Sequence, residues 1–130
     1  LSSLMPEPLD IDVEKRPWPI TNKLKSLIKG IVCINMIHIS PWTCTESLFE
    51  ESKNYIYQNQ FLMLYGPFFR KEKPTSESNL SFDHSLKLQN PLWGIRHLDR
   101  VKEVALENGY KIDKIIEMPA NNLSVIFRLN

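Results

Sequence analysis

The sequence predicts an α/β fold in which parallel strands are followed by an antiparallel hairpin. Two nearly continuous apolar runs, Ile31–Ile37 and Phe61–Tyr65, are typical of strands covered on both faces of a parallel sheet. A segment with helical spacing separates them, and strands separated by helices favour a parallel sheet. Apolar residues then recur on one face over residues 112–118 and alternate over 123–129, on either side of a turn, which predicts the hairpin.

The chain length predicts one globular domain over residues 1–130, because it is sufficient for one hydrophobic core and too short for two. A formal charge of +1 gives no electrostatic reason to expect nucleic acid or an anionic membrane as partner. No apolar run reaches the roughly 18 residues that cross a bilayer. The lone thiols of Cys33 and Cys44 fit a reducing compartment, so we expect a cytoplasmic or nuclear protein.

The first third of the chain predicts a strand, a loop, a weak helix and a second strand. Apolar residues alternate with aspartates over residues 9–13, which predicts a short strand. The proline-rich residues 17–19 end it, and residues 21–29 show weak helical spacing. The run Ile31–Ile37 is the second strand.

The middle of the chain predicts a helix, a buried strand and a long connection. Ser40 as N-cap and Pro41 at the first helical position start a helix that we expect to end at Asn59. The strand Phe61–Tyr65 follows and is stopped by the Gly-Pro pair after it. Residues 66–97 form a connection that is unusually long for a compact domain. Such connections are often functional, so we interpret this one as a lid-like insertion.

The insertion and the C-terminal segments contain further helical spacing. Phe82 and Leu86, four residues apart, predict a short helix that ends before Pro91. A second helix is expected from Asp99 as N-cap to Gly109. The hairpin strands follow.

The apolar run Ile31–Ile37 is typical of a central strand, yet little sequence precedes it that could form a neighbouring strand. A long apolar strand left at a sheet edge exposes unpaired backbone groups and invites association. We therefore expect a partner strand, either from sequence upstream of Leu1 or from another chain.

Three predicted strands end in polar or aromatic residues that should meet at one rim, because ligands bind beyond the carboxyl ends of parallel strands. The first strand ends at Asp12, the second at Asn35 and the third at Tyr65. This rim is the expected functional site.

Several motifs resemble the methyltransferase-like protein 26 family in residues and order. They are Cys33–Trp42, Leu64–Phe68, Ser78-Asn79, Phe82-Asp83, Asn90-Pro91 with Trp93-Gly94, and Glu117–Asn122. The resemblance implies the C-terminal part of a Rossmann-like class I methyltransferase sheet, which ends in such a hairpin. It also implies S-adenosylmethionine (SAM) as cofactor and a small-molecule or other acceptor that is not assigned.

The family's upstream half carries a G-x-G turn and a strand-ending acid for the cofactor, and neither occurs here. The four glycines are scattered. We therefore expect a fragment that by itself binds SAM weakly or not at all and is inactive. The alternative function is a non-catalytic interaction module, in which the edge at Ile31–Ile37 recruits a partner strand.

The resemblance places cofactor contacts at three positions. It implies that Asp12 accepts a hydrogen bond from the adenine amino group, against the alternative of a turn aspartate. Asn35 would hold the methionine part of the cofactor or the acceptor, although a turn-stabilising asparagine is the other interpretation. Met36, next to Asn35 in the sequence, is also assigned to cofactor binding.

His38 is the candidate general base, since an imidazole titrates near neutral pH. The alternative is a packing histidine between apolar neighbours. Methyl transfer often needs little beyond alignment of the acceptor.

Five residues are assigned to the acceptor and the lid. Tyr65 and Arg70 flank the mouth, where Arg70 binds an anionic group of the substrate or is simply solvated. Asn79 and Asp83 project from the lid toward the acceptor or face solvent on a capped helix. Asn121 lies in the hairpin turn, where asparagine is also expected for its backbone geometry alone.

No metal site is predicted. His84 and His97 have no partners at metal-ligand spacing, and Cys33 and Cys44 are too far apart in the sequence to suggest one.

Overall fold

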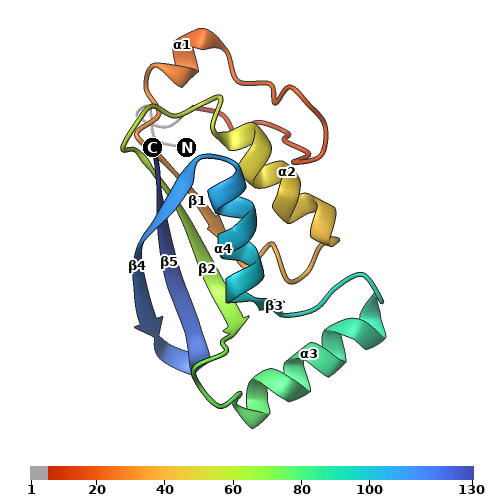
Figure 1. The fold of residues 1–130 in the computed structure, drawn as a ribbon. Helices are drawn as coiled ribbons and strands as arrows, with labels where there is room; N and C mark the ends of the chain where they lie inside the picture. The colour runs from red at the N-terminus through yellow and green to blue at the C-terminus, as the bar shows by residue number, and fades with distance from the viewer. Residues whose placement is uncertain (1–5) are drawn as a thin grey trace.

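A computed structural model describes residues 6–130 and contains a mixed sheet with helices on one face (Figure 1). The strand order is β1-β2-β5-β4, and a short β3 pairs beside β2. The strands are β1 Gly30–Ile34, β2 Phe61–Phe69, β3 Arg96–His97, β4 Tyr110–Met118 and β5 Asn122–Leu129. β1 and β2 are parallel, whereas β5 is antiparallel to both β2 and β4. The predicted α/β class, a parallel pair followed by an antiparallel hairpin, is confirmed.

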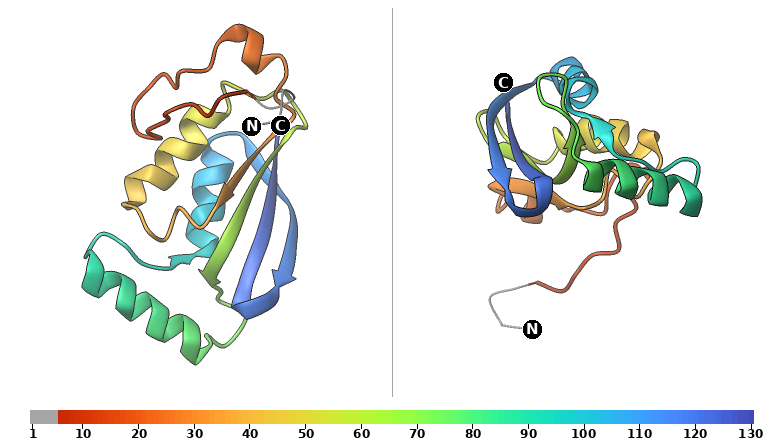
Figure 2. Two further views of the ribbon diagram at one scale, coloured as in Figure 1. Left: turned by 180° about the vertical axis from the view of Figure 1, so that it is seen from behind. Right: turned by 90° about the horizontal axis from the view of Figure 1, so that it is seen from below.

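Helices α2 (Trp42–Ser52) and α4 (Leu98–Glu107) cover the same face of the sheet. Figure 2 shows the molecule from behind, with the strands in front of these two helices. The helices are α1 Asn22–Lys25, α2 Trp42–Ser52, α3 Glu77–Gln89 and α4 Leu98–Glu107, with a 3-10 turn η1 at Pro119–Asn121. Phe49 of α2 and Val101 of α4 meet Leu62, Tyr110 and Phe127 of the sheet in the core, all fully buried. Within residues 6–130 none of the helices is both long and apolar enough for a bilayer crossing.

The strand predicted over residues 9–13 is wrong. Asp12 forms a turn there, because its Oδ1 accepts a hydrogen bond from the Glu14 backbone N–H at 3.0 Å. The segment is held instead by Trp18, whose ring stacks on Tyr55 with 5.3 Å between centroids. The Trp18 backbone N–H also donates to Tyr55 Oη at 3.0 Å. The N-terminal residues thus wrap α2 as a loop, and Leu1 lies outside the described residues.

The two buried strands differ in length from the prediction. β1 ends at Ile34 because Asn35 turns the chain with a φ of 52°. β2 continues through Gly66 and Pro67 to Phe69. β1 pairs with β2 only as far as Tyr65. The missing backbone N–H of Pro67 therefore costs no hydrogen bond to β1, and proline is tolerated there.

The helices also shift relative to the prediction. α2 ends at Ser52 rather than at Asn59, and turns follow at residues 53–55 and 58–59. The connection predicted over 66–97 begins only at residue 70, and its helix α3 spans 13 residues from the N-cap Ser76. The N-cap of α4 is His97 rather than Asp99. α3 lies across the end of the sheet toward which β1 and β2 point (Figure 1).

Candidate functional site

A cavity of about 540 Å³ opens at the carboxyl ends of β1 and β2, beneath α3. The loop after β1, the end of β2, the first half of α3 and the hairpin turn all contribute to its wall. Its lining residues are Asn35, His38, Ile39, Pro67, Ser78, Asn79, Phe82, Ala120, Asn121 and Asn122. Four residues predicted from the sequence, Asn35, His38, Asn79 and Asn121, therefore come together from three separate segments.

His38 is the most deeply buried titratable group of this cavity, with 3% of its surface exposed. Its Nδ1 is buried without a hydrogen-bond partner among the described residues, and its ring meets Phe82 edge-on at 5.7 Å. Burial, and secondly the positive charge of Arg96, lower the pKa of His38 below 6.5. The imidazole is therefore neutral near pH 7 and able to accept a proton.

Gly66 leaves the room that His38 and Asn35 occupy. A Cβ at this position would lie 3.3 Å from His38 Cε1 and 3.4 Å from both His38 Nδ1 and Asn35 Oδ1. The φ of Gly66 is also +155°, which favours glycine. From the sequence, Gly66 was predicted only to end a strand. In the structure it lies against the side chains of both Asn35 and His38.

Arg96 holds the loop that carries Asn35 and His38. Its Nε donates to Ile37 O at 3.1 Å and its Nη2 donates to Ser40 O at 2.7 Å. The Gly94 backbone N–H also donates to His38 O at 3.0 Å. Sequence reasoning missed Arg96, because Ile37 and Ser40 lie more than 50 residues away from it and no local pattern marks these contacts.

α3 is joined to the hairpin turn across the cavity mouth. Asn121 Nδ2 donates to Ser78 Oγ at 3.1 Å, and Asn79 Nδ2 donates to Asn121 O at 3.4 Å. Asn121 itself has a φ of 59°, the left-handed geometry for which asparagine is suited. Both asparagines thus serve as part of the wall and as the attachment of the helix above it.

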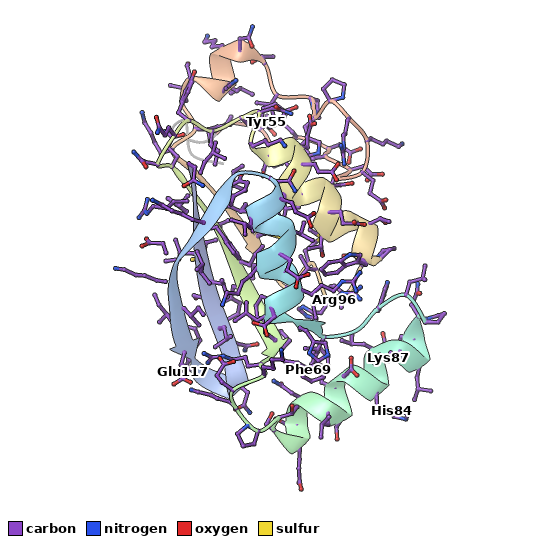
Figure 3. The ribbon with its side chains drawn as sticks, in the orientation of Figure 1. Tyr55, Phe69, His84, Lys87, Arg96 and Glu117 are labelled. Carbon is purple, nitrogen blue, oxygen red and sulfur yellow. The ribbon has the colours of Figure 1, made fainter. Side chains whose placement is uncertain are left out.

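Asp83 is buried but does not line the cavity. Its Oδ1 accepts from the Ile95 backbone N–H and its Oδ2 accepts from Lys87 Nζ, both at 2.8 Å. It fastens α3 to the segment before β3. His84 lies on the outer side of the same helix and is exposed (Figure 3).

Three other predicted residues stand outside this cavity. Asp12 is exposed in the N-terminal loop, so it ends no strand. Met36 packs against the core and accepts from Ser40 Oγ through its carbonyl oxygen at 2.8 Å. Tyr65 contributes its carbonyl oxygen, which accepts from the Asn35 backbone N–H at 2.9 Å.

Arg70 lines a second, neighbouring cavity of about 260 Å³. The two cavities share Asn79, Asn121 and Asn122 in their walls. Arg70 is only 17% exposed in its side chain, so it is not the solvated loop arginine of the alternative interpretation. Within residues 6–130 no group of three His, Cys, Asp or Glu side chains is placed to hold a metal ion.

The fold is that of methyltransferase-like proteins of known structure. MmcR, described as a mitomycin 7-O-methyltransferase, matches with a TM-score of 0.68 and 11% identity over 78% of this chain and 30% of that chain. CalO1, described as a methyltransferase in calicheamicin biosynthesis in an SAH-bound form, matches with a TM-score of 0.67 and 8% identity over 78% and 30%. LepI in complex with SAM matches with a TM-score of 0.67 and 12% identity over 78% and 26%.

At these identities the likeness establishes the fold alone, and the chain spans less than a third of the length of these proteins. A match at the level of sequence covers nearly the whole chain, residues 2–129. The chain belongs to the family described as "Protein of unknown function (DUF938)".

Proposed function

We propose that this chain is the acceptor side of a SAM-dependent methyltransferase similar to the methyltransferase-like protein 26 family. The observation that carries the proposal is the cavity at the carboxyl ends of β1 and β2, in which a neutral, buried His38 stands beside Asn35. Ligands of open α/β sheets bind at this end. The likeness in fold to proteins described with SAM or SAH supports the same cofactor.

SAM, when bound, supplies a methyl group whose bond to sulfur breaks as an acceptor lone pair attacks the carbon, which leaves S-adenosylhomocysteine. Nδ1 of His38 is covered and faces Gly66, so Nε2 is the atom that would take the proton released by the acceptor. Asn35 would orient the acceptor or the methionine end of the cofactor through its amide. Asp12 and Met36 lie outside this cavity, so the proposal gives them no contact with the cofactor in it.

Transfer is tested with the protein encoded by the whole gene, incubated with methyl-labelled SAM and a small-molecule extract. His38→Gln should lower incorporation about a hundredfold, the scale of general base catalysis. His84→Gln removes a histidine from the exposed side of α3 and should keep wild-type activity. Equal activity of both variants would remove His38 from the mechanism.

This chain alone should bind SAM weakly or not at all, since it has no G-x-G turn among its four glycines. Isothermal titration calorimetry on the 130 residues measures this directly. Micromolar binding would contradict the expectation and would place the main cofactor contacts within this chain.

A second candidate function is favoured by the exposed edge of the sheet. β1 leaves Val32 50% and Ile34 59% exposed, and within residues 6–130 it pairs only with β2. In this reading the chain is a non-catalytic interaction module that recruits a partner strand at Ile31–Ile37. The reading frame upstream of Leu1 separates the two functions, because a G-x-G turn and a strand-ending acid there would support the enzyme.

A further inference from the structure

The second cavity, next to the one that holds His38, has a wall rich in charged groups. Arg70 at the end of β2 and Lys73 in the following loop line one side, and Glu117 at the end of β4 lines the other. Figure 3 shows Glu117 at the tip of the hairpin, beside the loop that leads into α3. Phe68 and Met118 supply apolar floor. The lining therefore carries two cations and one carboxylate.

The carboxylate of Glu117 bridges both cations from an exposed position. It pairs with Lys73, and its Oε1 lies 3.6 Å from Arg70 Nη1. Lys73, and secondly Arg70, lower the pKa of Glu117, so the surroundings favour a negative charge at this point. Glu117 is 66% exposed in its side chain and stands on an edge strand, so it can swing away at little cost.

Arg70 is the fixed partner in this arrangement. Its side chain is 17% exposed, and its Nε donates to Glu72 Oε1 at 2.8 Å. A guanidinium held on one edge keeps its other N–H groups directed at a planar anion, which is the geometry for carboxylate and phosphate recognition. Lys73 adds a second, mobile charge.

We propose that this cavity is an anion subsite, in which Arg70 and Lys73 bind a carboxylate or phosphate of the methyl acceptor after it displaces Glu117. The identification of the ligand as a methyl acceptor rests on the proposed function, whereas the binding of an anion does not. Because Asn79, Asn121 and Asn122 line both cavities, the subsite is adjacent to the cavity that holds His38, and an acceptor long enough to reach both would place its anionic end here. The substrate class is a small organic acid or phosphate ester.

The proposal is tested by NMR titration of the ¹⁵N-labelled chain with sodium acetate and with sodium phosphate, at constant ionic strength. The reporters are the amides of Ser76, Asn79 and Asn121, which line the cavity. Arg70→Gln should weaken binding about tenfold, the value of one charge-assisted hydrogen bond. Glu117→Gln should tighten binding several-fold, because the displaced competitor is gone. The anion that binds more tightly identifies the chemical group.

Lys71→Gln is the matched control, since Lys71 belongs to the same loop but does not line this cavity. It should leave both affinities unchanged. The proposal is overturned if Lys71→Gln weakens binding as much as Arg70→Gln, which would mean general charge attraction, or if Glu117→Gln brings no gain. A gain in affinity cannot come from misfolding, so Glu117→Gln decides the matter even if Arg70→Gln is unstable. The titration uses neither SAM nor a methyl acceptor, so its failure leaves the role of His38 untouched.

Discussion

At the scale of single residues, the site depends on where one turn places two side chains. Asn35 leaves β1 in left-handed geometry, and His38 follows three residues later with its ring packed over Gly66. Burying an imidazole whose Nδ1 has no partner costs free energy, because the ring loses its hydrogen bonds to water. Since burial disfavours the charged form, the ring stays neutral near pH 7. Under the proposed function this free base receives the proton of the acceptor.

The pH dependence of stability follows from the lowered pKa of His38. As the pH falls below about 6.5 the unfolded chain takes up a proton that folded His38 resists, so the free energy of unfolding falls with pH in this range. His38→Gln removes this titration and should flatten the slope between about pH 6.5 and the lower pKa of the folded state. Urea unfolding at a series of pH values measures it. Identical slopes in the two proteins would mean that the ring is protonated as easily in the fold as outside it.

At the scale of elements, α3 determines the shape of both cavities. It begins with Ser76, whose Oγ accepts from the Asn79 backbone N–H at 3.1 Å, and it is attached at two points. Its first turn is bonded to the hairpin tip through Asn121, and its middle is fastened through Asp83. The outer face of the helix is exposed, so these polar attachments act together with the buried side chain of Leu86 to hold α3 in place.

Removing the carboxylate of Asp83 should loosen this helix. Asp83→Ala leaves the buried Ile95 N–H without its acceptor and should lower the free energy of unfolding by about 2 kcal/mol. Ser85→Ala, on the exposed side of the same helix, is the control and should change little. Chemical unfolding gives the free energy, and hydrogen exchange should show faster exchange along α3. A loss confined to global stability, with α3 protected as before, would contradict this account of the helix.

At the scale of the whole molecule, one face of the sheet carries α2 and α4 while the opposite face has no such layer in residues 6–130 (Figure 2). Val32 and Ile34 stand on that opposite face and pair in register with Met63 and Tyr65 of β2. The same strand forms one edge of the sheet. An apolar edge of this kind is a template for pairing with a further strand.

We expect this edge to make the chain self-associate. Ile34→Lys places a charge on the edge strand and should favour the monomer, since charged edge residues oppose strand pairing. Leu88→Lys replaces a still more exposed leucine on α3 and should leave association unchanged. Sedimentation velocity over a range of concentrations reports the outcome. A wild-type chain that stays monomeric throughout would rule out self-association through this edge.

Local patterns predicted most elements, and the misses have identifiable causes. The alternation over 123–129 and the apolar run before Asn35 located β5 and β1 because each depends on neighbouring residues. The alternation of apolar and polar residues also predicted a strand at 9–13, but within the described residues no other strand pairs with this segment. The stop placed at Gly66 failed because a strand tolerates proline where its neighbour has already ended.

By itself the sequence determined the class of fold and indicated the rim of the candidate site, since hydrophobic periodicity is local and Asn35 and His38 follow the end of a predicted strand. Only the tertiary structure decided what the other polar residues do. Asp83 turned inward to Ile95, Arg96 was bonded to carbonyl groups as far as 59 residues away, and Arg70 met Glu117 across the hairpin. These pairings depend on side chains that packing brings together from distant segments, and no spacing along the chain encodes such distances.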